Sequence, residues 1–190
     1  GTVVFCIPLI SRARATDWAR VCHLVDATIR SIIAQTDPAW RIILVGSDAP
    51  TLTAPIDDRY EFIATTRDLG DGSLRGRQAD AGYKRNLAER YARARGAGFI
   101  FFCDSDDLVS RHLVAAIREA NHPYGCILGR GYIIDAEQAR IAPLPLKNDV
   151  LSLDEQSASC AAFNTLARES IVASDVNRFG HVRFREALYR

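Results

Sequence analysis

The sequence is poor in several residue types, and each shortage narrows what the chain can be. It has no Met, only 2 of its 24 basic residues are Lys, and no CxxC pair occurs among its five cysteines. An odd number of cysteines without such a pair indicates that the cysteines are small buried hydrophobic residues of a protein in a reducing compartment. Because the sequence lacks Met and begins at Gly1 directly before an apolar run, we expect that Gly1 is not the natural start.

Long apolar runs and a strong net charge are also missing. No run approaches the roughly 18 apolar residues of a membrane helix, and no charged leader precedes a signal-like segment. The formal charge of +1 produces no field that would favour nucleic acid as a partner. We therefore expect no transmembrane segment, no nucleic-acid partner and a cytoplasmic location, at most peripheral at a membrane.

Apolar runs and helical periodicity alternate along the first two thirds of the chain. The alternation predicts strands and helices in the order strand 2–10, helix 17–36, strand 41–45, strand 60–64, helix 79–95, strand 99–103 and helix 110–121. Thr16 and Ser110 are the expected N-caps of the first and last helix. Strands joined through helices imply right-handed parallel crossovers. The predicted fold class is α/β, a three-layer α/β/α sandwich with a mainly parallel sheet, in one domain over residues 1–190.

The remaining third of the chain has weaker patterns. Residues 126–128 and 132–134 favour two strands of a hairpin, and residues 158–173 favour a mixture of strand and helix. Glycines and aspartates over 68–73 predict a mobile loop without a packed element.

Three carboxylates crowd the end of the fourth predicted strand, where the apolar run 99–103 leads into Asp104, Asp106 and Asp107. Like charges this close repel one another, and a divalent cation held by hard carboxylate oxygens is the usual relief. Ligands of open α/β sheets bind beyond the carboxyl ends of the strands, which is where this cluster lies. The pattern fits a Mg²⁺ or Mn²⁺ site, and it also fits an acidic turn that caps the next helix.

Four motifs in order resemble the inverting glycosyltransferases of family 2, which have the GT-A fold. Pro8 follows the first strand, the first helix ends in Ser-Ile-Ile-Ala-Gln-Thr over 31–36, and Lys-Arg-Asn-Leu occupies 84–87. The turn at 102–107 is similar to the DxD-type turn of that family. The resemblance implies transfer of a sugar from a nucleotide-diphospho-sugar, most often a UDP-sugar, to a saccharide, lipid or protein acceptor that the sequence does not identify.

The resemblance also implies roles for individual residues. Asp106 would be the Mn²⁺ or Mg²⁺ ligand, Asp104 would contact the ribose or the metal through water, and Asp107 would support the turn. Arg85 would approach the diphosphate or the acidic turn, and Pro8 would lie at the nucleotide. Residues 1–108 would form the nucleotide-binding half and residues 109–190 the acceptor side.

Two places depart from the family pattern. The acidic residues that read uracil at the end of the second strand are replaced by Gly46 and Ser47, with Asp48 one step later. Asp48 is the expected substitute, and an Asx-turn is its alternative role. Arg75 and Arg77 flank glycines in the mobile loop and could fold over a diphosphate; the alternative is that they are solvated loop arginines.

The second departure concerns the general base that an inverting transferase needs to deprotonate its acceptor. The family supplies it from a late acidic pair, and this chain ends at Arg190 about where that pair is expected. We therefore expect the C-terminus to be incomplete, with the base beyond Arg190 or at Glu186. The fallback candidates for the base are Asp175, Asp154, Glu155 and His181. The alternative is that the three carboxylates are ordinary surface charges and that the histidine has no catalytic role.

Two other classes of function stay open at this point. Asp104 and Asp106 after an apolar strand also fit a haloacid dehalogenase-type phosphatase, in which the first Asp is the nucleophile. That family places its motif after the first strand, whereas here it follows the fourth. A non-catalytic nucleotide-sugar binding domain is the other alternative.

Overall fold

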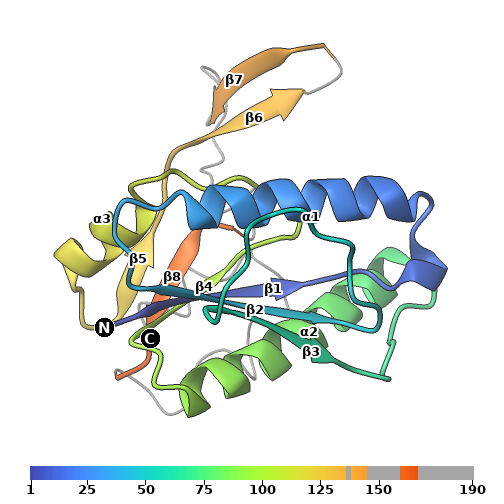
Figure 1. Cartoon of the computed structure of the whole chain (residues 1–190), viewed down its shortest axis with the longest axis horizontal. Coiled ribbons are helices and arrows are strands. Elements are labelled where there is room, and N and C mark those ends of the chain that lie inside the picture. The colour runs from blue at the N-terminus through green and yellow to red at the C-terminus, as the bar shows by residue number, and fades with distance from the viewer. Residues whose placement is uncertain (136–137, 145–158, 167–190) are drawn as a thin grey trace.

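The computed structural model describes residues 1–135, 138–144 and 159–166, and a six-stranded sheet is its centre (Figure 1). The strand order is β3-β2-β1-β4-β8-β5. The strands are β1 Val3–Pro8, β2 Trp40–Gly46, β3 Tyr60–Ala64, β4 Phe99–Phe102, β5 Gly125–Ile127 and β8 Ala161–Asn164. All neighbours pair in parallel except β8, which is antiparallel to both β4 and β5.

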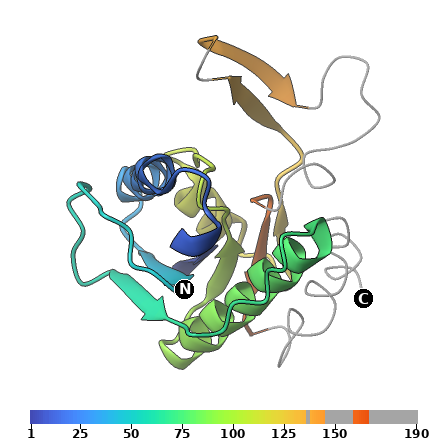
Figure 2. The ribbon, with the colours of Figure 1, turned by 90° about the vertical axis from the view of Figure 1, so that its right-hand side faces the viewer.

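Helices cover both faces of this sheet, so the predicted three-layer α/β/α sandwich is confirmed (Figure 2). On one face, α1 Trp18–Ile33 and α3 Leu113–Ala120 pack against the side chains of alternate strand residues such as Phe5. On the other face, α2 Leu74–Ala94 places Ala88 and Ala92 against the intervening residues, such as Val4. The strand β1 is apolar and buried on both faces because both are covered.

The helix starts differ from the sequence prediction. The N-cap of α1 is Asp17, whose carboxylate accepts a hydrogen bond from the Arg20 N–H, so the prediction of Thr16 is wrong. Helix α2 begins at Leu74, five residues before the predicted start at 79, with Ser73 as its N-cap. Its first turns are polar and contain a glycine, so they carry no apolar periodicity.

Helix α3 also starts later than predicted. The helix begins at Leu113, and its N-cap position is His112, which makes no side-chain capping bond. Ser110 instead accepts hydrogen bonds in the turn before the helix, from the N–H of His112 and the N–H of Leu113. The three polar residues 110–112 therefore form a separate turn.

The predicted hairpin between residues 126–128 and 132–134 is wrong. Strand β5 joins the main sheet beside β8, and β6 Gly131–Asp135 pairs instead with β7 Arg140–Leu144 in a two-stranded sheet that projects from the body (Figures 1 and 2). Gly125 explains the position of β5, because a Cβ on it would lie 2.1 Å from the Ala162 carbonyl oxygen. Its φ of +129° also favours glycine.

Among the described residues, no helix combines the length and the apolar character needed to cross a membrane.

Asp26, on the buried side of α1, fastens the loop after β2 to that helix. Its carboxylate accepts hydrogen bonds from the N–H groups of Thr53 and Ala54 at 2.6 and 2.7 Å and from Arg30 Nε at 2.8 Å. Partial burial alone would raise the pKa of Asp26, but these hydrogen bonds outweigh it and lower the pKa to about 2. The carboxylate is therefore held in its charged form.

We predict that Asp26→Asn lowers stability above pH 4 and flattens its dependence on acid. The folded pKa lies below the unfolded value near 4, so the ionised carboxylate contributes about 2 kcal/mol above pH 4, and this contribution is lost as the pH falls toward 2. Urea unfolding at pH 7 and between pH 4 and 2 measures it. The exposed Asp58→Asn is the matched control, and equal losses in both variants would contradict the prediction.

Candidate functional site

A cleft of about 700 Å³ lies at the carboxyl ends of β1 and β4. This volume is within the range of pockets for drug-sized ligands. Its walls come from the segment after β1, the start of α1, the loop before α2, the first turns of α2 and the turn after β4. The charged residues that line it are Arg14, Asp17, Arg20, Arg77, Asp80, Lys84, Asp104 and Asp106.

The acidic turn after β4 reaches this cleft through two of its three carboxylates. Asp104 and Asp106 line the cleft, and Asp107 is not among its lining residues. The Asp104 N–H donates to Ser159 Oγ at 2.7 Å, which anchors the backbone of the turn. Desolvation raises the pKa of Asp106, and the neighbouring Asp107 and Asp104 raise it further. The turn is thus a concentration of negative charge on the cleft wall.

Arg85 forms an ion pair with Asp104 from outside the cleft. Its Nη2 lies 2.5 Å from Asp104 Oδ1, its side chain is 10% exposed, and Arg85 is not a lining residue of the cleft. Of the two positions expected for this arginine, the structure shows the one against the acidic turn. One carboxylate of the turn is therefore fixed by a charge-assisted hydrogen bond.

The end of α1 fastens the chain that follows the acidic turn. Ser31 Oγ accepts a hydrogen bond from the Val109 N–H at 3.1 Å. Gln35 donates to the Ser110 carbonyl at 2.7 Å and accepts from the Val114 N–H at 2.9 Å. Thr36 donates its backbone N–H to the Arg111 carbonyl at 2.8 Å. The polar positions of the motif at 31–36 thus connect α1 to the segment 109–114.

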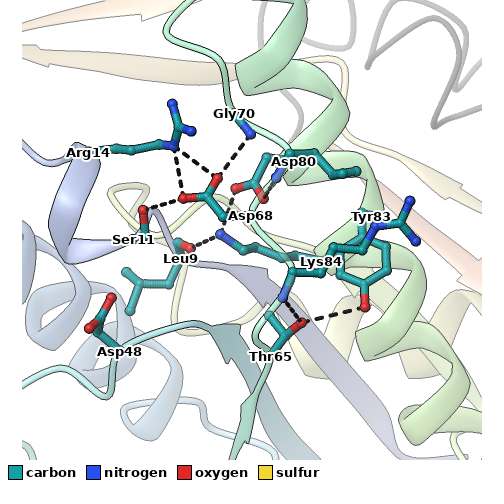
Figure 3. Close-up of polar contacts among 12 residues, drawn as sticks. Leu9, Ser11, Arg14, Asp48, Thr65, Asp68, Gly70, Asp80, Tyr83 and Lys84 are labelled. Carbon is teal, nitrogen blue, oxygen red and sulfur yellow. Dashed lines mark hydrogen bonds and ion pairs between the residues drawn. The ribbon is translucent and has the colours of Figure 1, made fainter.

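A buried ion pair forms the floor of the cleft beside β1. Lys84 Nζ donates to the Leu9 carbonyl at 2.8 Å and to Asp80 Oδ2 at 2.6 Å, and Lys84 is fully buried (Figure 3). Asp80 also accepts from the Leu69 N–H at 3.2 Å. The sequence analysis missed this pair, although its i,i+4 spacing on a helix was a visible signal.

A second carboxylate joins two loops at the rim of the cleft. Asp68 accepts hydrogen bonds from Ser11 Oγ at 2.8 Å, from Arg14 Nε and from the Gly70 N–H at 2.9 Å (Figure 3). The segment 68–73, predicted as a loop without a packed element, is thus fixed to the short 3₁₀ helix η1 Arg12–Arg14. Nothing local in the sequence indicates contacts between residues more than 50 positions apart.

Asp48, the expected contact of the nucleotide base, lies against the segment after β1. Its Oδ2 accepts a hydrogen bond from the Arg12 N–H at 2.9 Å, and Asp48 does not line the cleft. Figure 3 shows its carboxylate apart from the contacts around Asp68. The carboxylate therefore supports η1.

The other predicted site residues divide into three groups. Pro8 and Arg77 line the cleft together with Asp104 and Asp106, and Arg77 lies in the first turns of α2 instead of a mobile loop. Arg75, also in α2, does not line it. The candidates for a general base lie outside the described residues: Asp154, Glu155, Asp175, His181 and Glu186.

Within the described part of the chain, no three Asp, Glu, His or Cys side chains converge on a point where they could hold a metal ion. Asp104 and Asp106 nevertheless present hard oxygen donors to one cleft. Arg85 donates to Oδ1 of Asp104, and no described residue donates a hydrogen bond to Oδ2. The donor set therefore fits an ion such as Mg²⁺, which takes one or two protein carboxylates and completes its shell with water and phosphate oxygens.

The sequence matches one protein family model, and the structure is similar to solved structures of one fold. Residues 20–187 match the family model described as glycosyl transferase family 2. No curated protein sequence matches the chain.

Three similar solved structures are crystal structures of S. aureus TarS. The first shares 14% identity with a TM-score of 0.53, covering 87% of this chain and 28% of that one. TarS 1-349 in complex with UDP, and TarS 1-349 alone, each share 13% identity with a TM-score of 0.51, covering 87% of this chain and 47% of theirs. The chain thus spans less than half the length of these neighbours, and at such identities the likeness shows the fold alone.

We predict that Lys84→Met destabilises the protein by about 3–5 kcal/mol, because it leaves the buried Asp80 without its charge partner. Lys84→Met/Asp80→Asn should recover part of that loss, since the unpaired charge is then gone. Urea unfolding at pH 7 measures both. Arg90→Met, an exposed change on the same helix, is the control and should stay within about 0.5 kcal/mol of the wild type. A loss below about 1 kcal/mol for Lys84→Met would contradict the pair.

Proposed function

The chain belongs to glycosyl transferase family 2, and from this premise we propose that it transfers a sugar from a nucleotide-diphospho-sugar to an acceptor hydroxyl. Its GT-A type of fold agrees with the family. We propose a UDP-sugar as the donor, which the UDP complex of the TarS 1-349 neighbour supports.

One observation carries the proposal: carboxylates and cationic side chains share the cleft at the carboxyl edge of the sheet. A departing nucleoside diphosphate gains negative charge, which preorganised positive groups stabilise. Arg77 on α2 lies in the wall of that cleft, and the fully buried ammonium of Lys84 is paired with Asp80 at its floor. Pro8 provides an apolar surface beside them at the end of β1.

Asp106 is the proposed ligand of a divalent metal, Mn²⁺ or Mg²⁺, with Asp104 as its partner or as a ribose contact. When bound, such an ion supplies positive charge at the diphosphate. Arg85 keeps the Asp104 carboxylate in one orientation, and Ser159 keeps its backbone in place. The two residues thus organise the acidic turn before any ligand arrives.

The acceptor side is proposed to follow the acidic turn. Residues 1–108 would bind the donor and residues 109–190 the acceptor, a saccharide, lipid or protein hydroxyl. An inverting transfer requires a base that removes the proton of this hydroxyl as it attacks the sugar. We propose Glu186 for that role, with a residue beyond Arg190 as the other source.

A non-catalytic nucleotide-sugar binding domain remains the second candidate, because the residues expected to supply the general base lie outside the described part of the chain. Binding of UDP with neither transfer nor hydrolysis of UDP-sugars would favour it. For the phosphatase alternative no support remains, since the acidic turn follows β4 and the chain belongs to a glycosyltransferase family.

We predict that Asp106→Asn abolishes Mn²⁺-dependent binding of UDP and leaves the fold intact, because the residue lies in the turn after β4 and outside the hydrophobic core. Calorimetric titration with UDP, with and without Mn²⁺, measures the binding, and thermal unfolding monitors the fold. Asp107→Asn is the matched control, since Asp107 is adjacent but does not line the cleft. Unchanged Mn²⁺-dependent binding in Asp106→Asn would remove the residue from the metal site.

We predict that Glu186→Gln lowers the rate of sugar transfer by about 10²–10⁴, the usual cost of a lost general base, without changing the affinity for UDP. A coupled assay of UDP release with a panel of acceptors measures the rate. Wild-type activity in this variant would place the base elsewhere.

A further inference from the structure

Arg14 lines the cleft, and only one of its three guanidinium nitrogens, Nε, donates hydrogen bonds to described residues. Its Nε donates to both carboxylate oxygens of Asp68, at 2.9 and 2.8 Å. The two terminal nitrogens make no hydrogen bond among the described residues, although the charge of Arg14 also interacts with that of the nearby Asp71, and Figure 3 shows them on the side of the guanidinium away from Asp68. Two terminal NH₂ groups are a planar fork that matches the oxygens of a phosphate.

Asp68 is held in place independently of Arg14. Ser11 Oγ and the Gly70 N–H both donate to it, so its carboxylate is fixed from the segment after β1 and from its own loop. Partial burial would raise the pKa of Asp68, but the hydrogen bonds from Arg14, Ser11 and Gly70 outweigh it and lower the pKa. Asp68 therefore stays ionised and keeps its contact with Nε.

Gly70 provides the space in which the guanidinium lies. A Cβ at this position would lie 3.0 Å from Arg14 Nε, 3.1 Å from its Cδ and 3.2 Å from its Cζ. These distances are shorter than ordinary van der Waals contact, so a side chain at position 70 would require the guanidinium to shift by a few tenths of an ångström. The guanidinium therefore lies between the backbone of Gly70 and the carboxylate of Asp68.

We propose that Arg14 binds a phosphate oxygen of the donor diphosphate with its terminal nitrogens, and that Asp68 is the positioning residue that aims it. The inference rests on the proposed function and adds a residue of η1 to the donor site. Arg77 lies in the same cleft on α2, so guanidinium groups of two different elements are available to one dianionic group. A phosphate is preferred to a neutral ligand because the fork is charged and lies beside a carboxylate that already satisfies Nε.

The test compares UDP with uridine, titrated into the whole chain with Mn²⁺ present. Arg14→Gln should weaken UDP binding by about 10- to 100-fold, the effect of lost charge-assisted hydrogen bonds, and leave uridine binding unchanged. Arg12→Gln is the matched control: Arg12 belongs to the same 3₁₀ helix but lines a separate hollow beside Trp18, and it should bind both ligands as the wild type does.

The positioning role has its own readout. Asp68→Asn and Gly70→Ala should each weaken UDP binding in the same direction as Arg14→Gln, again without changing uridine binding. In the double variant Arg14→Gln/Asp68→Asn the losses should not add, because Asp68 acts on the phosphate only through Arg14. Additive losses, or equal weakening of uridine and UDP, would show a merely structural role and overturn the assignment.

Titration with inorganic pyrophosphate distinguishes a failure of the proposed function from a failure of the Arg14 assignment alone. A wild-type chain that binds neither UDP nor pyrophosphate overturns the proposed function and this inference with it. A wild-type chain that binds UDP, with Arg14→Gln binding it equally well, overturns the inference alone. Thermal unfolding of each variant confirms that the comparison is made between folded proteins.

Discussion

Parallel pairing of β1 with both β2 and β4 determines where the cleft and the helices that cover the sheet lie in the described part of the chain. Val3 is opposite Trp40 on one side and Phe99 on the other, so the three strands run in one direction and end at one edge of the sheet. The covering helices are required by the same arrangement, because strands that are apolar on both faces must be buried on both. The cleft forms at the shared carboxyl edge, where the chain leaves β1 and β4 for its loops.

A parallel sheet brings these loops together but does not orient their side chains, and polar contacts between loops do that. The segment after the acidic turn is held by Ser31 of α1 and by Gln35, which follows that helix. The acidic turn itself is held by Arg85 of α2. These hydrogen bonds fix the backbone after the acidic turn and one oxygen of Asp104, whereas the buried Nε of Arg85 has no hydrogen-bond partner among the described residues.

The sequence predicts those parts of this arrangement that depend on contiguous residues. The apolar runs around Phe5 and Phe101 predict two central strands, and the acidic turn follows directly from the second. The start of α2 was missed, because a helix that opens with polar residues around Gly76 shows no apolar period. Contacts between distant segments have no signal in the local sequence pattern. Arg14 contacts Asp68 because β1 and β3 end at the same edge of the sheet. Strand β5 pairs with β8, which is distant in sequence, instead of with β6.

The pairing of Val3 with Phe99 has a consequence for the growing chain. While the ribosome is still adding the residues before β4, one edge of β1 has no strand beside it, and its sequence Val-Val-Phe-Cys-Ile is apolar, rich in β-branched residues and without charge. Such a segment is prone to pair with another nascent chain when exposed. Contacts this far apart also form slowly, since a long loop must close first. We therefore expect β1, which lies at the centre of the folded sheet, to be prone to aggregation during synthesis until β4 has emerged from the ribosome.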